Sequence, residues 1–259
     1  MIITLKDDVA PNKSGRVFLD DYCKIWDTDL LKIKNINEEI VLETLCQREI
    51  DWLFIIGWSQ IAKQPLLNAS KKGVLGIHPT LLPQGRGRAS IPWAIIKGLS
   101  KTGVTLFKLD EGLDTGPIID QEILPLAEDE TATQLYERVN VAHRTLLRRV
   151  WPSLIADQLQ LIPQDNNLAT EWCGRKPEDG QITLDMSGLQ VSRLVRATTH
   201  PYPGAFIDYQ GKRYRLWSGC FYSRKQVNYP FEVDVNGILH LGLIDGLFDV
   251  TKWDVENII

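Results

Sequence analysis

The sequence lacks the features that mark secreted and membrane-spanning proteins. No apolar run in its 259 residues approaches the roughly 18 residues of a membrane-spanning helix, and the first residues, MIITLKDD, lack the long apolar stretch of a signal peptide. The four cysteines include no Cys-x-x-Cys pair and no histidine at metal-ligand spacing. We therefore expect reduced thiols, no metal site and a cytoplasmic location.

An excess of positive charge is also missing. The chain has 29 Lys and Arg against 33 Asp and Glu, which gives a net charge of −4 and a pI of about 5.6. This balance argues against nucleic acid as the main partner, because nucleic-acid-binding proteins usually carry a basic surface. The 44% of hydrophobic and 24% of charged residues are typical of a globular protein with one large domain and a small appendage.

Alternating strand and helix patterns predict an α/β fold over residues 1–163. Short apolar runs indicate buried strands, and amphipathic segments between them indicate helices, an order typical of a Rossmann-like, mostly parallel sheet. The expected strands are 1–5, 52–58, 73–78, 102–110 and 117–126, and the expected helices are 17–25, 38–48, 60–69, 92–99 and 130–151.

The pattern changes after residue 163. A polar, irregular segment is followed by a predicted helix at 187–197 and then by short β runs, which the turn signals Gln210-Gly211, Asn236-Gly237 and Asp245-Gly246 separate. Residues 164–259 are therefore expected to form a small β-rich C-terminal domain.

The first candidate catalytic residue is His78, in the segment GVLGIHPTLLPQGRGR (73–88). The strand 73–78 delivers this histidine to the carboxyl edge of the sheet, where ligands bind in open α/β folds. The following loop is rich in Pro, Gly and Arg, and such loops bring backbone amides and positive charge close to an anion.

Asp114 is the second candidate, in the turn Gly112-Leu113-Asp114-Thr115-Gly116 between two predicted strands. A carboxylate beside an imidazole fixes the imidazole tautomer and favours its charged form, which suits transfer chemistry. The alternative is that Asp114 merely shapes the turn.

The two segments together resemble a known family. HPTLLPQGRGRASIPWAIIKG followed by TGVTLFKLDEGLDTGPII is similar to the N10-formyltetrahydrofolate-dependent formyltransferases, and GRKPEDGQI and LVRATTHPYPGAF resemble the appended domain of their tRNA and sugar-nucleotide branches. The likeness covers roughly residues 40–210. It implies N10-formyltetrahydrofolate as the formyl donor and no metal.

The resemblance also implies roles for individual residues. His78 would stabilise the tetrahedral oxyanion and help to move protons, while Asp114 would orient the imidazole. Trp58, Leu109 and Leu113 are candidates for contacts with the pteridine of the donor.

One departure from the family lies at Gly76. The family motif is Asn-x-His, and its Asn side chain is expected to hold the formyl oxygen, which glycine cannot do. Loss of such a donor costs about 10²–10³ in rate if nothing compensates. Gln60, Thr80 or a water molecule could compensate, or the protein could be weakly active or inactive.

A second departure lies at the start of the chain. Family members begin with a strand and a helix before a segment like MIITLKDD, so the first strand–helix unit is expected to be missing or residues 1–35 to be reorganised. A lost central strand would expose sheet edge and core.

The acceptor is expected to be a nucleotide-linked amino sugar, of the 4-amino-4,6-dideoxyhexose type, in the synthesis of a surface polysaccharide or another glycan. Arg86 and Arg88 offer two guanidinium forks suited to a diphosphate, and RGRA resembles the sugar-nucleotide branch. Thr80, Trp93 and Tyr202 are further candidates for substrate contacts. The β-rich tail is expected to bind substrate or to form a homodimer.

Three rival functions stay open at this point. They are methionyl-tRNA formyltransferase, a formyltetrahydrofolate hydrolase that uses the same His/Asp pair, and a catalytically degenerate protein that binds folate or a nucleotide sugar.

Overall fold

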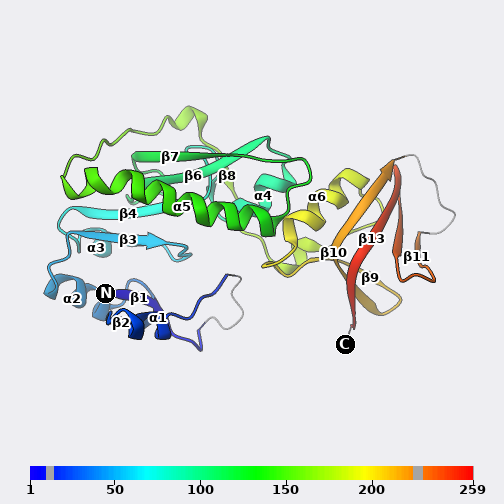
Figure 1. Cartoon of the computed structure of the whole chain (residues 1–259), viewed down its shortest axis with the longest axis horizontal. Coiled ribbons are helices and arrows are strands. Elements are labelled where there is room, and N and C mark those ends of the chain that lie inside the picture. Colours follow the sequence, from blue (N-terminus) through cyan, green and yellow to red (C-terminus); the bar gives the residue numbers. More distant parts are fainter. Residues whose placement is uncertain (10–14, 224–229, 259) are drawn as a thin grey trace.

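The computed structural model describes residues 1–9, 15–223 and 230–258. Figure 1 shows an elongated molecule with an α/β part in blue to green and a β-rich part in yellow to red. No helix in these described ranges has the length and apolar character needed to cross a bilayer.

The strands of the first part form three sheets with mixed pairing. β1 pairs in parallel with β2, and β3 pairs in parallel with β4, but β4–β6 and β6–β7 are antiparallel. The α/β fold class is thus confirmed, while the antiparallel pairs were not predicted from the sequence. The strands are β1 (Ile2–Leu5), β2 (Leu30–Ile33), β3 (Trp52–Ile56), β4 (Gly73–His78), β5 (Arg86–Gly87), β6 (Lys101–Lys108), β7 (Ile118–Pro125) and β8 (Glu171–Trp172).

One long helix covers one face of the four-stranded sheet. α5 begins with a capping box between Thr131 and Gln134, and its apolar stripe packs on β6 and β7 in a core cluster that also contains Leu75 and Ile77 of β4. Side chains alternate along a strand, so Gly76 and His78 face the opposite side of the sheet. The helices of this part are α1 (Asp20–Ile25), α2 (Glu39–Gln47), α3 (Gln64–Leu67), α4 (Ser90–Ile96) and α5 (Ala132–Ile155).

β1 and β3 do not pair with each other among the described residues. A cavity of about 300 Å³, lined by apolar side chains of β1, α2 and β3, lies between them.

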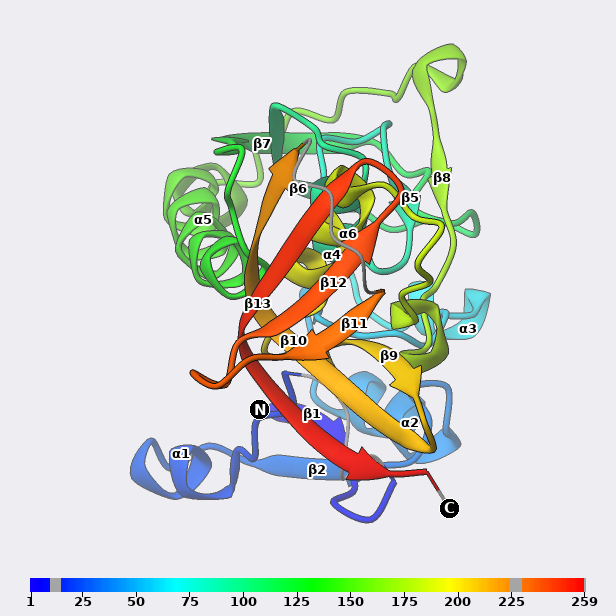
Figure 2. The same cartoon turned by 90° about the vertical axis from the view of Figure 1, so that its right-hand side faces the viewer.

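The second part is a five-stranded antiparallel sheet that packs on one helix, as the sequence predicts. The strand order is β11-β12-β13-β10-β9, and Figure 2 shows this sheet in front of α6. α6 begins with a capping box between Ser187 and Gln190 and joins the two parts by packing on both α4 and β10. Its elements are α6 (Gly188–Thr198), β9 (Ala205–Tyr209), β10 (Lys212–Ser223), β11 (Phe231–Val233), β12 (Leu239–Leu243) and β13 (Gly246–Asn257).

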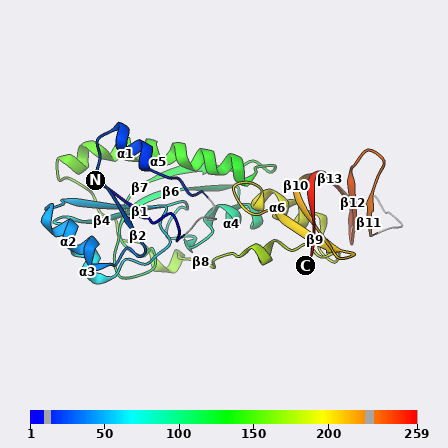
Figure 3. The ribbon, with the colours of Figure 1, turned by 90° about the horizontal axis from the view of Figure 1, so that it is seen from below.

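The connection between the two parts runs back over the α/β part. Figure 3 shows the segment that contains β8 passing along one side of the molecule. β8 pairs in parallel with β5, which belongs to the loop after His78. The expected domain boundary at residue 163 stays a prediction, but residues 164–172 are in direct contact with that loop.

Candidate active site

His78 is the last residue of β4 and is almost fully buried, with 8% of its surface exposed. Its Nε2 lies 2.8 Å from the carbonyl oxygen of Gly85 and 3.4 Å from Oγ of Ser90. A carbonyl oxygen can only accept, so this contact requires a proton on Nε2. The ring therefore presents an N–H on this side to an oxygen atom.

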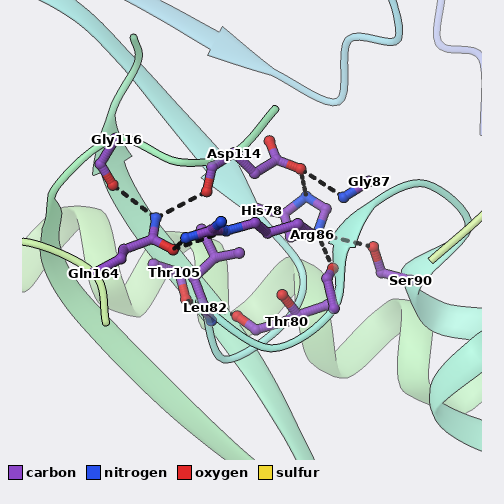
Figure 4. Close-up of polar contacts among 11 residues, drawn as sticks. His78, Thr80, Leu82, Arg86, Gly87, Ser90, Thr105, Asp114, Gly116 and Gln164 are labelled. Carbon is purple, nitrogen blue, oxygen red and sulfur yellow. Dashed lines mark hydrogen bonds and ion pairs between the residues drawn. The ribbon is translucent and has the colours of Figure 1, made fainter. Parts of the chain in front are cut away.

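Asp114 lies on the other side of the same ring (Figure 4). Its Oδ2 is 3.6 Å from Nδ1 of His78 and accepts a hydrogen bond of 2.8 Å from the backbone N–H of Gly87. Asp114 has a φ of +54°, a left-handed conformation that Asp and Asn tolerate better than other side chains. The structure thus brings the two predicted catalytic residues together, and a proton on Nδ1 would face the carboxylate.

A buried hydrogen-bond network fixes the loop that follows His78. Thr105 on β6 donates to the carbonyl of Thr80 at 2.7 Å and accepts from the N–H of Leu82 at 3.1 Å. Gln121 on β7 donates to both Thr105 and the Leu82 carbonyl at 2.8 Å. The beginning of the loop is therefore tied to two strands, which fixes the chain around the imidazole.

Arg86 does not offer its guanidinium to solvent, contrary to the sequence-based expectation. It is 5% exposed, and it donates to Oε1 of Gln164 from Nε at 3.2 Å and from Nη2 at 2.8 Å, and to Oδ1 of Asn166 at 2.9 Å. These bonds hold the loop against the connecting segment. They leave Arg86 a poor candidate for the diphosphate clamp that its sequence position suggests.

Gly76 lies in the centre of the sheet, where its missing side chain would face the same side as His78. A Cβ atom built there would lie 2.9 Å from Cδ2 of Leu109 and 3.1 Å from Cε1 of Phe107. The side chain of Leu109 therefore occupies the space where an asparagine would begin.

We expect Gly76→Asn to destabilise the protein instead of restoring a family-like site. Overpacking a core position costs about 1–3 kcal/mol, which corresponds to a fall in Tm of roughly 2–4 °C per kcal/mol for a chain of this size. Thermal unfolding of Gly76→Asn and of the double variant with Leu109→Ala tests this. A Tm for Gly76→Asn equal to that of the unmodified protein would contradict the steric explanation.

The two side chains proposed to replace the missing Asn have different surroundings. Gln60 is used elsewhere, because it accepts from the N–H of Ile36 at 2.8 Å and donates to the carbonyl of Lys34 at 2.9 Å. Oγ1 of Thr80 is buried and has no hydrogen-bond partner within the described part of the chain. Thr80 is two residues after His78 in the catalytic loop and its hydroxyl has no competing partner, so it is the stronger candidate.

The candidates for the donor site lie on two segments, one after β3 and one in the turn of Asp114. Trp58 follows β3 and is partly buried, with its Nε1 3.3 Å from Oε1 of Gln60, whereas Ile56 at the end of β3 is in register with Ile77 and so faces the α5 side of the sheet, away from His78. Leu113, next to Asp114, is 46% exposed. Trp58 and Leu113 fit a flat, partly apolar ligand, whereas the N–H of Leu109 is already bonded to the Val74 carbonyl at 2.8 Å.

Arg88 and Trp93 lie in a cluster of cations and aromatic rings beside the catalytic loop. Arg175 lies over the Trp93 ring at 5.0 Å, and Lys97 lies 5.5 Å from Trp93 and 5.9 Å from Trp172. The Arg88 side chain lies over Gly174, and the Trp172 ring lies against Gly85. The Trp93 indole N–H also donates to the carbonyl of Cys173 at 2.8 Å, so the ring is fixed beside the cations, which it helps to position.

Tyr202 is not brought to His78. Its ring packs on the core cluster that α5 covers, on the opposite face of the sheet, and burial next to Tyr136 raises the pKa of its hydroxyl. The aromatic character that suggested a substrate contact is explained by this packing.

Four residues near the site were not predicted from the sequence: Ser90, Gln164, Lys97 and Arg175. Ser90 could have been predicted from the sequence, because it begins the helix after the catalytic loop. Gln164 carries no local signal, since its partners lie 48 to 78 residues earlier in the chain.

Comparison of the sequence with known families gives two matches in chain order. Residues 9–151 match the formyl transferase family, and residues 175–238 match the formyl transferase C-terminal domain. The first match alone covers more than half of the chain.

Solved structures share the fold at low sequence identity. HypX from Aquifex aeolicus in complex with tetrahydrofolic acid has a TM-score of 0.71 at 17% identity over 97% of this chain, but the chain spans 43% of HypX. An N-formyltransferase from Helicobacter canadensis with folinic acid and dTDP-3-aminofucose has a TM-score of 0.67 at 18% identity. The match covers 93% of this chain and 85% of the Helicobacter protein. Methionyl-tRNA formyltransferase from Clostridium thermocellum has a TM-score of 0.64 at 23% identity, and the match covers 99% of this chain and 96% of that enzyme.

Proposed function

The chain belongs to the formyl transferase family, and we propose that it transfers a formyl group from N10-formyltetrahydrofolate to the amine of a nucleotide-linked amino sugar. The observation that carries this proposal is the buried His78, held between Asp114 and an oxygen atom on its Nε2 side. Known structures with the same fold contain folates, and one contains dTDP-3-aminofucose.

In the proposed reaction the acceptor nitrogen attacks the formyl carbon of the donor, and the formyl oxygen becomes an oxyanion. Collapse of this intermediate breaks the bond between the formyl carbon and N10. The acceptor nitrogen loses one proton and N10 gains one, so a group that moves a proton serves both steps.

His78 would act on this oxyanion through its Nε2–H. The Gly85 carbonyl marks a place where an oxygen atom accepts from Nε2 at 2.8 Å, and the formyl oxygen would take that place once the Gly85 peptide moves aside. Asp114 would stabilise the charge on the imidazole that accompanies proton transfer. The hydroxyls of Thr80 and Ser90 are the donors that support this reaction without the family Asn.

Trp58 and Leu113 would form apolar walls for the pteridine of the donor. Leu113 is exposed and directly precedes Asp114, so a pteridine on this side chain would lie next to the catalytic pair.

The acceptor would be held by its phosphates at the Arg88, Lys97 and Arg175 cluster. None of these three cations forms a salt bridge within the described part of the chain, although Arg175 donates to the backbone carbonyl of Asp179 at 2.6 Å, and burial lowers the pKa of the Arg175 guanidinium. Both facts favour an anion at this place. A 4-amino-4,6-dideoxyhexose is our proposal for the sugar, and a 3-amino sugar is the alternative that the Helicobacter structure suggests.

We expect Arg88→Ala and Lys97→Ala to raise KM for the nucleotide-linked acceptor by about 10-fold or more each, with little change in kcat. Loss of one charge-assisted hydrogen bond is worth about 1.5–3 kcal/mol, and contacts outside the reacting centre act mainly on binding. Steady-state kinetics with varied acceptor measures this. Arg148→Ala, an exposed arginine on α5, is the matched control, and an equal effect there would contradict a specific site.

The test of the proposed function is release of tetrahydrofolate with different acceptors. The purified chain is incubated with N10-formyltetrahydrofolate and with a panel of nucleotide-linked 3- and 4-amino sugars, with methionyl-tRNA, or with no acceptor. We expect release with an amino sugar. Release with methionyl-tRNA, or equal release without any acceptor, would overturn the assignment in favour of a tRNA formyltransferase or a hydrolase.

A further inference from the structure

We propose that Gln164 is a positioning residue, which holds the turn of Asp114 and the loop after His78 in register with each other. The inference rests on the proposed function, because it assigns Gln164 a role in the same reaction. Gln164 lies in the segment that connects the two parts of the chain, outside the strands and helices that form the α/β part.

The side chain of Gln164 uses all of its hydrogen-bonding groups at this site. Its Nε2 donates to the backbone carbonyl of Asp114 at 2.8 Å and to that of Gly116 at 2.7 Å. Its Oε1 accepts two bonds from the Arg86 guanidinium, at 2.8 and 3.2 Å. Figure 4 shows Gln164 between Arg86 and the turn of Asp114.

Asp110 braces the turn from within through Gly112 and Thr115, and Gln164 supplies the side-chain bonds to the carbonyls of Asp114 and Gly116. Residues 110–113 of this turn are exposed, and Asp114 itself has a left-handed backbone conformation. Since the carboxylate lies 3.6 Å from Nδ1 of His78, a small movement of the backbone would remove it from the ring. The two bonds from Nε2 of Gln164 fix the backbone on both sides of Thr115.

The contact between Oε1 of Gln164 and Arg86 acts on the loop after His78, on the other side of the imidazole from the Asp114 turn. Arg86 lies between Gly85, whose carbonyl accepts from Nε2 of His78, and Gly87, whose N–H donates to Asp114. By holding the buried Arg86 guanidinium, Gln164 supports the chain next to Gly87, together with the bonds that Thr170 and Trp172 make to the backbone of this loop. One side chain therefore connects the groups that contact the two nitrogens of the imidazole.

Gln164→Glu separates these two contacts. The carboxylate of glutamate still accepts from Arg86, but it has no N–H for the carbonyls of Asp114 and Gly116. A displacement of about 1 Å in a catalytic group can cost about 10²-fold in rate, so we expect kcat/KM to fall about 10²-fold while folate binding is unchanged. Gln158→Glu, an exposed glutamine on the surface of the same part, is the matched control and is expected to change kcat/KM less than twofold.

A double-variant cycle distinguishes positioning from a general structural effect. If Gln164 acts through Asp114, the loss caused by Gln164→Glu shrinks to less than threefold in an Asp114→Asn background. The same 10²-fold loss in both backgrounds would overturn the proposal, as would full activity of Gln164→Glu.

Imidazole ¹⁵N NMR gives a readout that needs no acceptor. The chain has four histidines, so the His78 resonances can be assigned from the spectrum of His78→Ala. We expect Gln164→Glu to move the Nδ1 resonance of His78 toward its position in Asp114→Asn, whereas an unchanged resonance would overturn the role of Gln164. If the unmodified protein transfers no formyl group, the proposed function fails but this comparison still decides the positioning role.

Discussion

Replacement of His78 by alanine is expected to lower kcat/KM for formyl transfer by about 10²–10⁴-fold, the range typical of a positioned acid–base group. The substitution removes the N–H that faces an oxygen atom at 2.8 Å and the group that Asp114 contacts on the other side. Steady-state kinetics with saturating donor and a nucleotide-linked amino sugar measures the loss. The affinity for the folate is expected to change little, because the pteridine candidates lie on other segments.

His200→Ala is the matched control for this experiment. His200 is exposed, stacks on Trp217 in the C-terminal part and makes no described contact with the catalytic pair. A His78→Ala variant that is folded and retains full activity would rule out His78 as the group that acts on the formyl oxygen.

Asp114→Asn is expected to lower kcat by about 10³–10⁴-fold, because an analogous carboxylate-to-amide change beside a catalytic histidine costs about 10⁴. Asparagine keeps the shape, tolerates the left-handed backbone at a φ of +54° and can still accept from the N–H of Gly87. It removes the negative charge that faces Nδ1 of His78. The comparison therefore isolates the charge from the geometry of the turn.

Asp110→Asn provides the control within the same turn. Asp110 accepts from the N–H of Gly112 at 3.1 Å and from the Thr115 hydroxyl at 2.6 Å, and an amide oxygen can retain both bonds. Activity close to that of the unmodified protein is expected. Equal losses in the Asp110 and Asp114 variants would mean that the turn responds to any change of charge and would remove Asp114 from the mechanism.

The central pair of the site could be predicted from the sequence because its signals are local. His78 ends a buried strand and Asp114 lies in a turn bracketed by glycines, and each pattern is contained within a few residues. The roles of Arg86 and Gln164 could not be predicted in this way. They depend on a contact between residues 78 positions apart, which buries the guanidinium that the sequence analysis assigned to a diphosphate.

The fold shows the same division between local and long-range information. Strands and helices with clear periodicity were found near their observed positions, including β4, α5 and the turns of the C-terminal sheet. β2 was missed because lysines interrupt the apolar pattern of LLKIK. The structure explains Lys32 by its ion pairs with Asp7 and Asp20, which lie earlier in the chain. The antiparallel direction of β6 was missed because pairing direction depends on the whole connection and not on the strand itself.

The most direct test of the central claim is transfer of an isotopic label from donor to sugar. The chain is incubated with N10-formyltetrahydrofolate that carries a ¹³C-formyl group and with nucleotide-linked amino sugars, and the sugar products are analysed by mass spectrometry. We predict a labelled formamide on the sugar amine, formed by the unmodified protein and lost in His78→Ala and Asp114→Asn. Label that is found only in free formate or on methionyl-tRNA, or an unchanged yield of labelled sugar from both variants, would contradict the account.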